Sequence, residues 1–277
     1  MGACICIPSD EERLNDLAGA ISAYKADWIF LTPTTAKLLN PDDVPCLRTL
    51  VIGGEASPPQ LIKLWSSVEN LELLNGYGPT ETVVFATCYR FSPSSKVTTL
   101  GRGIGTRCWV VNFEEERHCR IDEVGELLIE SPAMARGYLD DDEKTRKAFI
   151  DPPTWLKWMG VESRLYRTGD LVAYEHDGAL VYVGRADHQV KVRGQRMELG
   201  EVEHAIALDD AIDSVVAMLF NRTILVVVSF RSHAEEDAFL QLRMDPSGQW
   251  REKVRTIQRQ LSSKLPQYMI PTIWLVS

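Results

Sequence analysis

Strands and helices alternate in the first part of the sequence, and this alternation restricts the fold more than any other feature. Two apolar runs, "WIFLTP" at 28–33 and "TLVIGGE" at 49–55, have the length of strands and end in turn residues. The segment "PPQLIKLWSSV" at 58–68 has helical spacing and leads to a third strand, "LELLNGYG" at 71–78. Strands that alternate with helices pack as a mostly parallel sheet, so this region should be α/β.

One strand and one helix are predicted before this region. "ACICI" at 3–7 is interpreted as a buried strand that begins without a turn or cap, as if the chain had been entered in the middle of a domain. In the segment 9–27, Ser9 can cap a helix and Glu12 lies at the third helical position. Apolar residues then recur with helical spacing, so we expect a single helix.

The second part of the sequence changes to short strands and turns. From 92 to 175, strands such as "RCWVVN" and "GELLIE" are interrupted by a helical piece, "DDEKTRKAFI", and a barrel-like β region is expected. The hairpin "LVAYEHDGALVYVGR" has its turn at Asp177-Gly178. The pattern then becomes strand, helix, strand, strand, helix, which indicates a small α+β unit. We therefore expect a large domain over 1–186 and a small domain over 187–277.

Composition excludes several classes of protein. With 45% hydrophobic and 25% charged residues, the chain resembles an ordinary soluble globular protein. The net charge of −9 and the pI near 5.2 provide no basic surface for a phosphate backbone, so nucleic acid is not an expected partner. The apolar runs are far shorter than the roughly 18 residues of a membrane span. The start has no basic leader, and Cys6 stands where N-myristoylation requires Ser or Thr. A cytosolic chain without membrane contact is expected.

The cysteines form no C-x-x-C pair, and His118 beside Cys119 is too isolated for a zinc site. We expect reduced, mostly buried thiols in preference to disulfides or metal ligands. The six cysteines are Cys4, Cys6, Cys46, Cys88, Cys108 and Cys119.

The most informative chemistry lies in "NGYGPTE" at 75–81. Two glycines and a proline force a tight loop, which presents a ring, a hydroxyl and a carboxylate from the end of a strand. These groups suit a nucleotide. Tyr77 can stack on a base, Thr80 can donate to a phosphate, and Glu81 can bind the magnesium that phosphates carry. A plain turn is the alternative for this segment taken alone.

Three further segments follow in order: "GELLIESPAMARGYL", "YRTGDL" and "GRADHQVKVRGQRMELGEVE". Together with "NGYGPTE" they closely resemble the adenylate-forming enzymes, and among them the adenylation domains of nonribosomal peptide synthetases. The runs 189–191 and 196–201 are similar to the peptide-synthetase branch, and "IPSDEERLNDLAGAI" is similar to fungal members. The resemblance covers essentially the whole chain. It implies the C-terminal part of that fold, with an α/β sheet subdomain, a β-barrel-like subdomain and a small C-terminal α+β domain.

The resemblance also implies roles for nucleotide-binding residues. Tyr77 would stack on adenine, Thr80 would contact the α-phosphate and Glu81 would bind Mg²⁺. Asp170 would accept charge-assisted hydrogen bonds from both ribose hydroxyls, with a helix cap or turn as the alternative. Arg185 is similar to the family arginine near ribose and phosphate, with a surface salt bridge as the alternative. The segment that matches the adenine side of the pocket, for which a strand-to-helix turn is the alternative, is Gly54, Glu55 and Ala56.

Residues of the small domain match the family's second half-reaction. Asp187 matches the hinge about which this domain turns. Lys191 and Gly194 match positions presented in the thioester-forming orientation, although a solvated strand face would also explain Lys191. The resemblance implies ATP or AMP and Mg²⁺ as cofactors and the phosphopantetheine of a carrier as acyl acceptor. The implied partners are an amino acid, a peptidyl carrier domain and other synthetase modules.

The implied function is activation of an amino acid with ATP to an aminoacyl adenylate, which is loaded on the carrier for secondary-metabolite peptide synthesis. Positions that match the family's side-chain pocket are apolar and roomy, which favours a hydrophobic or aromatic amino acid. These positions are Phe30, Val51, Gly53, Gly76, Val84 and Phe85.

Glycines in "LGRGIGTRCWVVN" suggest a dinucleotide-binding loop, because Gly101, Gly103 and Gly105 lie close together. That loop needs a helix after its glycines. Since "RCWVVN" has the pattern of a strand, we expect a turn in the β region instead.

Parts of the family's site do not occur in this sequence. The Gly/Ser/Thr-rich phosphate loop and the aspartate for the substrate amino group belong upstream, and "LPQYMIPTIWLVS" stops before the terminal Asn-Gly-Lys. Loss of one preorganised group typically costs about 3–4 kcal/mol, so we expect that the chain alone does not adenylate at a useful rate. The alternatives are a non-catalytic remnant or binding module, and an acyl-CoA ligase-like enzyme.

Overall fold

The computed structural model of the chain describes residues 2–187, 189–192, 195–220, 223–231 and 249–276. Gly194 lies outside these residues. The chain forms two compact units, Met1–Ala186 and Asp187–Ser277, and each is described by itself. No helix in the described ranges is both long and apolar enough to cross a membrane.

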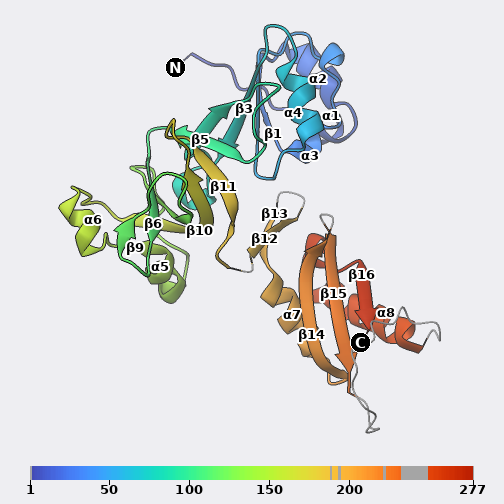
Figure 1. Ribbon diagram of the computed structural model, residues 1–277. Helices are drawn as coiled ribbons and strands as arrows, with labels where there is room; N and C mark the ends of the chain where they lie inside the picture. Colours follow the sequence, from blue (N-terminus) through green and yellow to red (C-terminus); the bar gives the residue numbers. More distant parts are fainter. Residues whose placement is uncertain (1, 188, 193–194, 221–222, 232–248, 277) are drawn as a thin grey trace. The chain divides into compact units, whose positions relative to one another are not determined.

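The first unit is built on a sheet of eleven strands, of which the first three are parallel (Figure 1). These are β1 (Trp28–Leu31), β2 (Thr49–Gly53) and β3 (Glu72–Tyr77), and helix α4 (Pro59–Ser66) connects β2 to β3. The predicted α/β arrangement is therefore confirmed. Two short elements, α3 (Pro33–Ala36) and the 3₁₀ turn η1 (Pro41–Asp43), lie between β1 and β2.

Apolar faces of these elements form one core. Trp65 of α4 is fully buried and packs with Leu50 and Ile52 of β2 and Leu73 of β3. Burial of such side chains contributes about 1.5–3 kcal/mol each, which holds the helix against the parallel strands. The carboxyl ends of β2 and β3 are thereby fixed side by side, with Gly53 opposite Gly76 in the ladder.

The segment 9–27 forms two helices where one was predicted. Helix α1 (Asp10–Asn15) has the expected capping box between Ser9 and Glu12. It ends at Asn15, and the side chain of the next residue, Asp16, accepts a hydrogen bond from the Gly19 N–H (3.1 Å) and so caps helix α2 (Leu17–Tyr24). Aspartate competes for backbone donors in this way and favours caps over helix interiors, which explains the interruption.

The prediction of a buried strand at 3–7 was wrong. These residues form no strand in the described part of the chain, and Ile5 is 84% exposed. Apolar residues form a strand only where a partner ladder and a covering face exist, and the described residues provide neither here.

The expectation of mostly buried thiols was also wrong. All six cysteines are free, but Cys119 alone is buried, while Cys4 and Cys6 are exposed.

An antiparallel part continues the sheet beyond β3, in the order β4, β5, β11, β10, β8, β6 and β7, with β9 paired to β10. The strand path ends at β7 and does not close into a barrel among the described residues. The predicted hairpin is confirmed, since β10 pairs with β11 and Gly178 has φ +81° in the turn. The bounds are β4 (Thr87–Arg90), β5 (Thr99–Gly103), β6 (Arg107–Asn112), β7 (Arg117–His118), β8 (Gly125–Glu130), α5 (Asp142–Ala148), β9 (Phe149–Ile150), α6 (Thr154–Trp158), β10 (Leu165–Tyr174) and β11 (Leu180–Arg185).

The glycine-rich stretch at 101–105 behaves as expected. Its first glycines end β5, and the chain turns directly into β6. No helix follows the glycines, so the geometry of a dinucleotide-binding loop is not present here.

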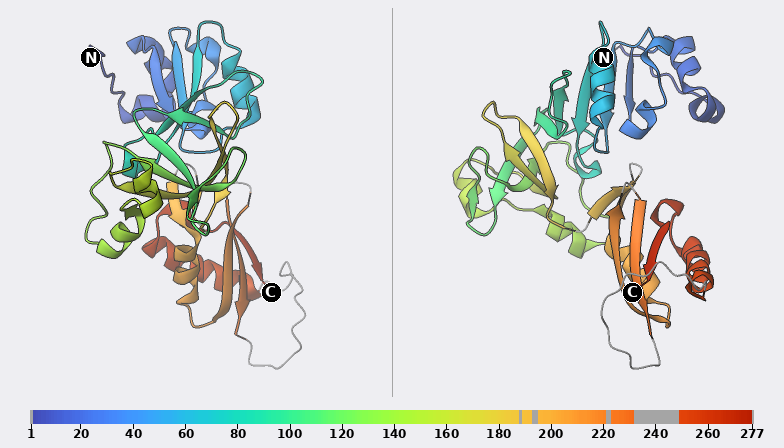
Figure 2. Two further views of the ribbon diagram at one scale, coloured as in Figure 1. Left: turned by 60° about the vertical axis from the view of Figure 1, so that its left-hand side comes forward. Right: turned by 45° about the vertical axis from the view of Figure 1, so that its right-hand side comes forward.

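The second unit has a hairpin, a three-stranded sheet and two longer helices (Figure 2). Strands β14 and β15 are antiparallel, and β16 is parallel to β15. Helices α7 and α8 bury Val202, Ile206, Ile257 and Leu261 in one core with the strands. The predicted order of elements is found, with two additional strands. The bounds are β12 (Gln189–Val192), β13 (Gln195–Glu198), α7 (Leu199–Ala207), β14 (Ile212–Phe220), β15 (Thr223–Phe230), α8 (Gln249–Lys264), η3 (Gln267–Met269) and β16 (Ile273–Val276).

Candidate functional site

The loop after β3 is held in a compact shape by its backbone. Tyr77 is the last residue of β3, and its carbonyl accepts a hydrogen bond from the Ala86 N–H at 2.7 Å. A Cβ at position 78 would lie 2.6 Å from the Ala86 nitrogen, so only glycine fits where the returning chain passes. The 3₁₀ turn η2 (Thr80–Thr82) carries Glu81. Tyr77 and Glu81 are thus presented from the carboxyl end of a parallel strand, where α/β sheets commonly bind ligands.

A strained stretch closes the same loop. Val83 and Val84 have φ values of +61° and +66°, which β-branched residues rarely adopt. Outliers of this kind cost of the order of 1–3 kcal/mol and persist where surrounding structure enforces them, commonly near functional sites. Here the return of the chain to β3 and the Phe85 N–H bond to the Val83 carbonyl (2.8 Å) enforce the bend.

Three predicted nucleotide-binding residues meet in one cluster. The Tyr77 hydroxyl donates to Oδ2 of Asp170, although the two residues are 93 positions apart in the sequence. Arg185 Nη1 donates to Oδ1 of the same carboxylate (2.9 Å) and to the Thr168 carbonyl (2.9 Å). Asp170 is 9% exposed. One buried carboxylate therefore connects β3, β10 and β11.

Asp170 lies beside an irregularity in β10. The register of β10 against β8 shifts between Arg167 and Leu171, and Gly169 has φ +69°. Buried and partly exposed residues still alternate through this stretch, so Asp170 lies on the buried face, and it is opposite Arg185 in the ladder with β11. Asp170 is thus neither a helix cap nor a turn residue. Arg185 is not a surface salt bridge either, because its side chain is 17% exposed.

Electrostatics keep the Tyr77 hydroxyl protonated. Burial, followed by the Asp170 carboxylate, raises the pKa of the Tyr77 hydroxyl well above its ordinary value. Tyr77 therefore remains a hydrogen-bond donor near neutral pH. The carboxylate is stabilised by two donors and can still offer lone pairs to a polar ligand.

Glu81 is held by a segment that the sequence patterns did not assign to the site. The Tyr138 hydroxyl donates to Glu81 Oε1 at 2.6 Å, and the Ala135 N–H donates to the Glu81 carbonyl at 2.8 Å. Both partners belong to "GELLIESPAMARGYL", a segment in which no site residue was predicted from the sequence. Thr80, on the same turn, is exposed. No cluster of three metal-binding side chains occurs among the described residues, so a cation here would have one carboxylate and would need ligand oxygens.

The segment after β2 lies at the neighbouring strand end. Gly54 has φ +85°, a conformation that suits glycine. Glu55 Oε2 accepts a hydrogen bond from the Thr34 hydroxyl at 2.6 Å, while its buried Oε1 has no hydrogen-bond partner among the described residues. Ala56 is exposed. The geometry agrees with a turn between β2 and α4, and it leaves a buried acceptor near the sheet edge.

Five of the six predicted pocket residues lie together. The rings of Phe30 and Phe85 meet edge to face, with centroids 5.1 Å apart. Gly76 lies beneath Phe85, and Val51 and Gly53 lie on the adjacent strand. The sixth residue, Val84, is 52% exposed.

Replacing Gly76 by alanine should destabilise the first unit. An added Cβ would lie 2.6 Å from Cδ1 of Phe85 and 3.1 Å from Cγ1 of Val51. Overpacking of this kind costs about 1–3 kcal/mol, which urea denaturation would measure. Gly184→Ala is the control, because a Cβ there meets nothing within 4 Å and should change the free energy of unfolding by less than about 0.5 kcal/mol. Equal effects of the two substitutions would contradict close packing over Gly76.

Two predicted site residues, Asp187 and Lys191, belong to the second unit. Asp187 is exposed, and its Oδ1 accepts a hydrogen bond from the Gln189 N–H at 3.1 Å. Lys191 is exposed on β12, opposite Arg196 of β13.

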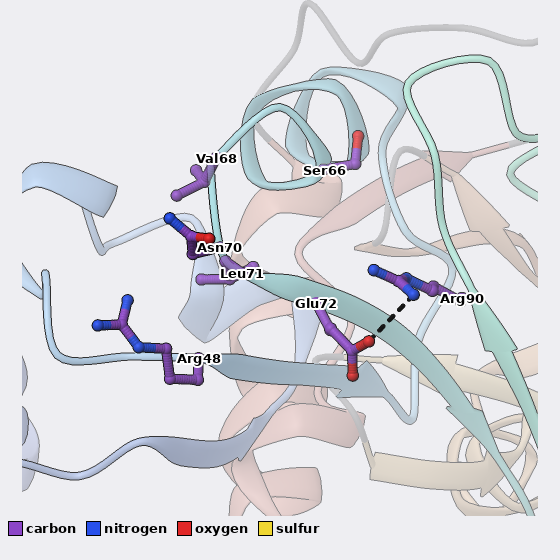
Figure 3. A pocket seen from close by; sticks show the side chains of 7 residues that line it. All are labelled: Arg48, Ser66, Val68, Asn70, Leu71, Glu72 and Arg90. Atoms are coloured by element: carbon purple, nitrogen blue, oxygen red, sulfur yellow. Dashed lines mark ion pairs between the residues drawn. The ribbon is translucent and has the colours of Figure 1, made fainter.

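A separate depression of about 740 Å³ lies at the other ends of the parallel strands (Figure 3). Arg48 precedes β2, and Glu72 begins β3 and pairs with Arg90 at 3.1 Å. The lining residues are Arg48, Ser66, Val68, Asn70, Leu71, Glu72 and Arg90, none of which was a predicted site residue.

The chain is similar in sequence to a known protein family and to fungal proteins. Residues 1–139 match the family described as AMP-binding enzyme. The chain is 40% identical over its whole length to nonribosomal peptide synthetase nlsA of Emericella nidulans, and 41% identical over 99% of its length to nonribosomal peptide synthetase 1 of Aspergillus fumigatus. It spans only 5% of each of these relatives.

The chain is also similar to solved structures of adenylation domains. PA1221, a nonribosomal peptide synthetase protein with adenylation and PCP domains, is 26% identical, with a TM-score of 0.73 over 94% of this chain and 50% of its own. The Vibrio cholerae adenylation domain AlmE, solved with glycyl-adenosine-5'-phosphate, is 25% identical, with a TM-score of 0.74 over 97% of this chain and 49% of its own. The chain thus spans about half of these solved proteins.

Proposed function

The chain belongs to the AMP-binding enzyme family, and from this we propose that it forms part of a nonribosomal peptide synthetase adenylation domain. Such a domain joins an amino acid carboxylate to the α-phosphorus of ATP, which releases pyrophosphate and leaves an aminoacyl adenylate. The acyl group then passes to the phosphopantetheine thiol of a carrier, and AMP leaves. The cluster of Tyr77, Asp170 and Arg185 is the observation that carries this proposal.

The cluster suits the nucleoside half of ATP. A buried carboxylate with fixed donors is a strong acceptor for vicinal hydroxyls, and Asp170 would bind the ribose in this way. Tyr77 would contact adenine, and Gly54, Glu55 and Ala56 at the neighbouring strand end would lie along the base. The second donor bond of Arg185, to the Thr168 carbonyl, supports a role in orienting Asp170 as well as in contacting ribose or phosphate.

Glu81 is suited to bind a magnesium ion that is also bound by phosphates. One carboxylate and several phosphate oxygens commonly complete its coordination, and Glu81 is partly accessible on its turn. The bound ion would neutralise charge on the phosphates. Thr80, exposed beside it, would donate to the α-phosphate.

The amino acid side chain would bind against the apolar group around Phe30 and Phe85. Because Phe85 covers Gly76 and meets Phe30 edge to face, the wall is aromatic, which supports a hydrophobic or aromatic substrate. In the second half-reaction Asp187 would act as hinge and Lys191 would serve thioester formation. A carrier domain as partner is supported by the similarity to PA1221, whose name includes a PCP domain.

Amino-acid-dependent ATP–pyrophosphate exchange tests this function. The protein in the longest form in which it is made should exchange with one or a few apolar amino acids, whereas the 277-residue chain alone, shown to be folded, should not. Exchange by the chain alone would contradict its predicted inactivity. Thioester formation with free CoA would favour an acyl-CoA ligase. Folded protein that neither exchanges nor binds AMP would favour a non-catalytic binding module.

A further inference from the structure

The side chain and the backbone of Glu81 are both held by one distant segment. The Tyr138 hydroxyl, 57 positions away in the sequence, donates to Oε1 at 2.6 Å. Three residues before Tyr138, the Ala135 N–H donates to the Glu81 carbonyl at 2.8 Å. Two contacts at opposite ends of one residue fix its rotamer as well as its position, which a single contact would not do.

Tyr138 is itself fixed on several sides. Its N–H donates to Oγ1 of Thr145 in α5 at 2.8 Å. Its ring packs against Phe149, with centroids 5.6 Å apart, and Lys144 Nζ lies 4.9 Å from the ring centroid. The hydroxyl lies 3.4 Å from that of Tyr166, which is fully buried in β10. The hydroxyl of Tyr138 therefore has little freedom to leave Glu81.

We propose that Tyr138 is a positioning residue for the metal-bound nucleotide: its hydroxyl holds Oε1 of Glu81 so that the carboxylate meets the cation in one orientation. The inference rests on the proposed function of Glu81. Groups that orient a metal-binding carboxylate typically change metal affinity by about 10–100-fold when they are removed. In this role Tyr138 would act through Glu81, to which its hydroxyl donates.

Tyr138→Phe tests this proposal because it keeps the ring contacts with Phe149 and Lys144 and removes only the hydroxyl. The protein in the longest form in which it is made would be titrated with β,γ-methylene-ATP by calorimetry, once with Mn²⁺ and once with EDTA. We expect the affinity with Mn²⁺ to fall about 10-fold and the affinity with EDTA to stay within 2-fold. Glu81→Gln should remove the effect of Mn²⁺ altogether.

Tyr174→Phe is the matched control. It also removes a tyrosine hydroxyl, which donates to the Cys108 carbonyl at 2.5 Å within the antiparallel sheet. Its titrations should equal those of the wild type, and thermal denaturation would verify that every variant is folded.

The outcomes separate this inference from the proposed function. If Glu81→Gln weakens binding with Mn²⁺ but Tyr138→Phe does not, the positioning role is wrong and the metal site stands. If Tyr138→Phe weakens binding equally with Mn²⁺ and with EDTA, Tyr138 supports only the fold and the inference fails. If the wild type does not bind the analogue, the proposed function fails and the inference fails with it.

Discussion

Replacing Asp170 by alanine should lower the free energy of unfolding of the first unit by about 3–5 kcal/mol. The carboxylate accepts hydrogen bonds from Tyr77 and Arg185, and both partners would lose this acceptor in a mostly buried place. Loss of the carboxylate charge beside the largely buried Arg185 guanidinium accounts for most of the cost, since this pairing offsets part of the desolvation of the guanidinium. Urea denaturation of the whole chain, in which the unfolding transition of the first unit is monitored, would measure this loss of free energy.

The control for this substitution is a second acid–arginine pair on the same sheet. Glu72 and Arg90 are 3.1 Å apart, but their side chains are 48% and 68% exposed. Glu72→Ala should therefore cost at most about 1 kcal/mol. Equal losses for the two substitutions would show that the Asp170 carboxylate has no special structural role.

Asp170→Ala should also reduce the affinity for AMP about 10- to 100-fold, because hydrogen bonds to a charged group contribute about 1.5–3 kcal/mol each. Calorimetry on the protein in its longest form would give this value at a temperature at which the variant is folded. Unchanged affinity in a folded variant would mean that Asp170 does not contact the ribose.

Glu81→Gln should lower kcat/KM of ATP–pyrophosphate exchange by on the order of 100- to 1000-fold. The amide is isosteric and can still accept the Tyr138 hydrogen bond through its oxygen, so the fold should be unaffected. What is lost is the negative charge that would hold the cation on the phosphates, and one such preorganised contact typically contributes about 3–4 kcal/mol. Initial rates at saturating amino acid, measured over a range of Mg²⁺, would give the change.

Glu143→Gln is the control for Glu81→Gln. Glu143 lies on α5, is 74% exposed and pairs with Lys147 at 2.6 Å, so its loss should leave the exchange rate within about 2-fold. A loss below 3-fold for Glu81→Gln would contradict its assignment as metal ligand. A comparable loss in both variants would indicate a general effect of charge.

Local patterns were enough to predict most elements of the sheet. The strands at Trp28–Leu31, Thr49–Gly53 and Glu72–Tyr77 follow from short apolar runs that end in turn residues, and the capping box at Ser9 is encoded within four positions. The break at Asp16 was missed because aspartate is compatible with a helix surface and with a cap. At Ile5 and its neighbours the apolar residues suggested burial, but burial depends on a partner surface.

The candidate site was predicted in its residues but only partly in its contacts. Tyr77, Asp170 and Arg185 were selected by their motifs, yet no local pattern encodes that Tyr77 would donate to a carboxylate 93 positions away. Tyr138 gave no signal because its role arises from a hydrogen bond to a turn 57 positions earlier. A tyrosine is more commonly a packing residue, and only the three-dimensional contacts distinguish that role from the positioning of Glu81.

The position of Asp170 between distant strands has a consequence for the order in which the protein folds. Asp170 faces Tyr77 only when β10 has paired with β8 and β11 and when β3 is already in the sheet, so contacts of very different sequence separation must all exist first. Closing long loops costs entropy before any contact compensates for it, and such pairings therefore form slowly. We therefore expect the cluster to be completed late in folding, so that partially folded chains which already contain most of the sheet would still lack the proposed nucleotide site.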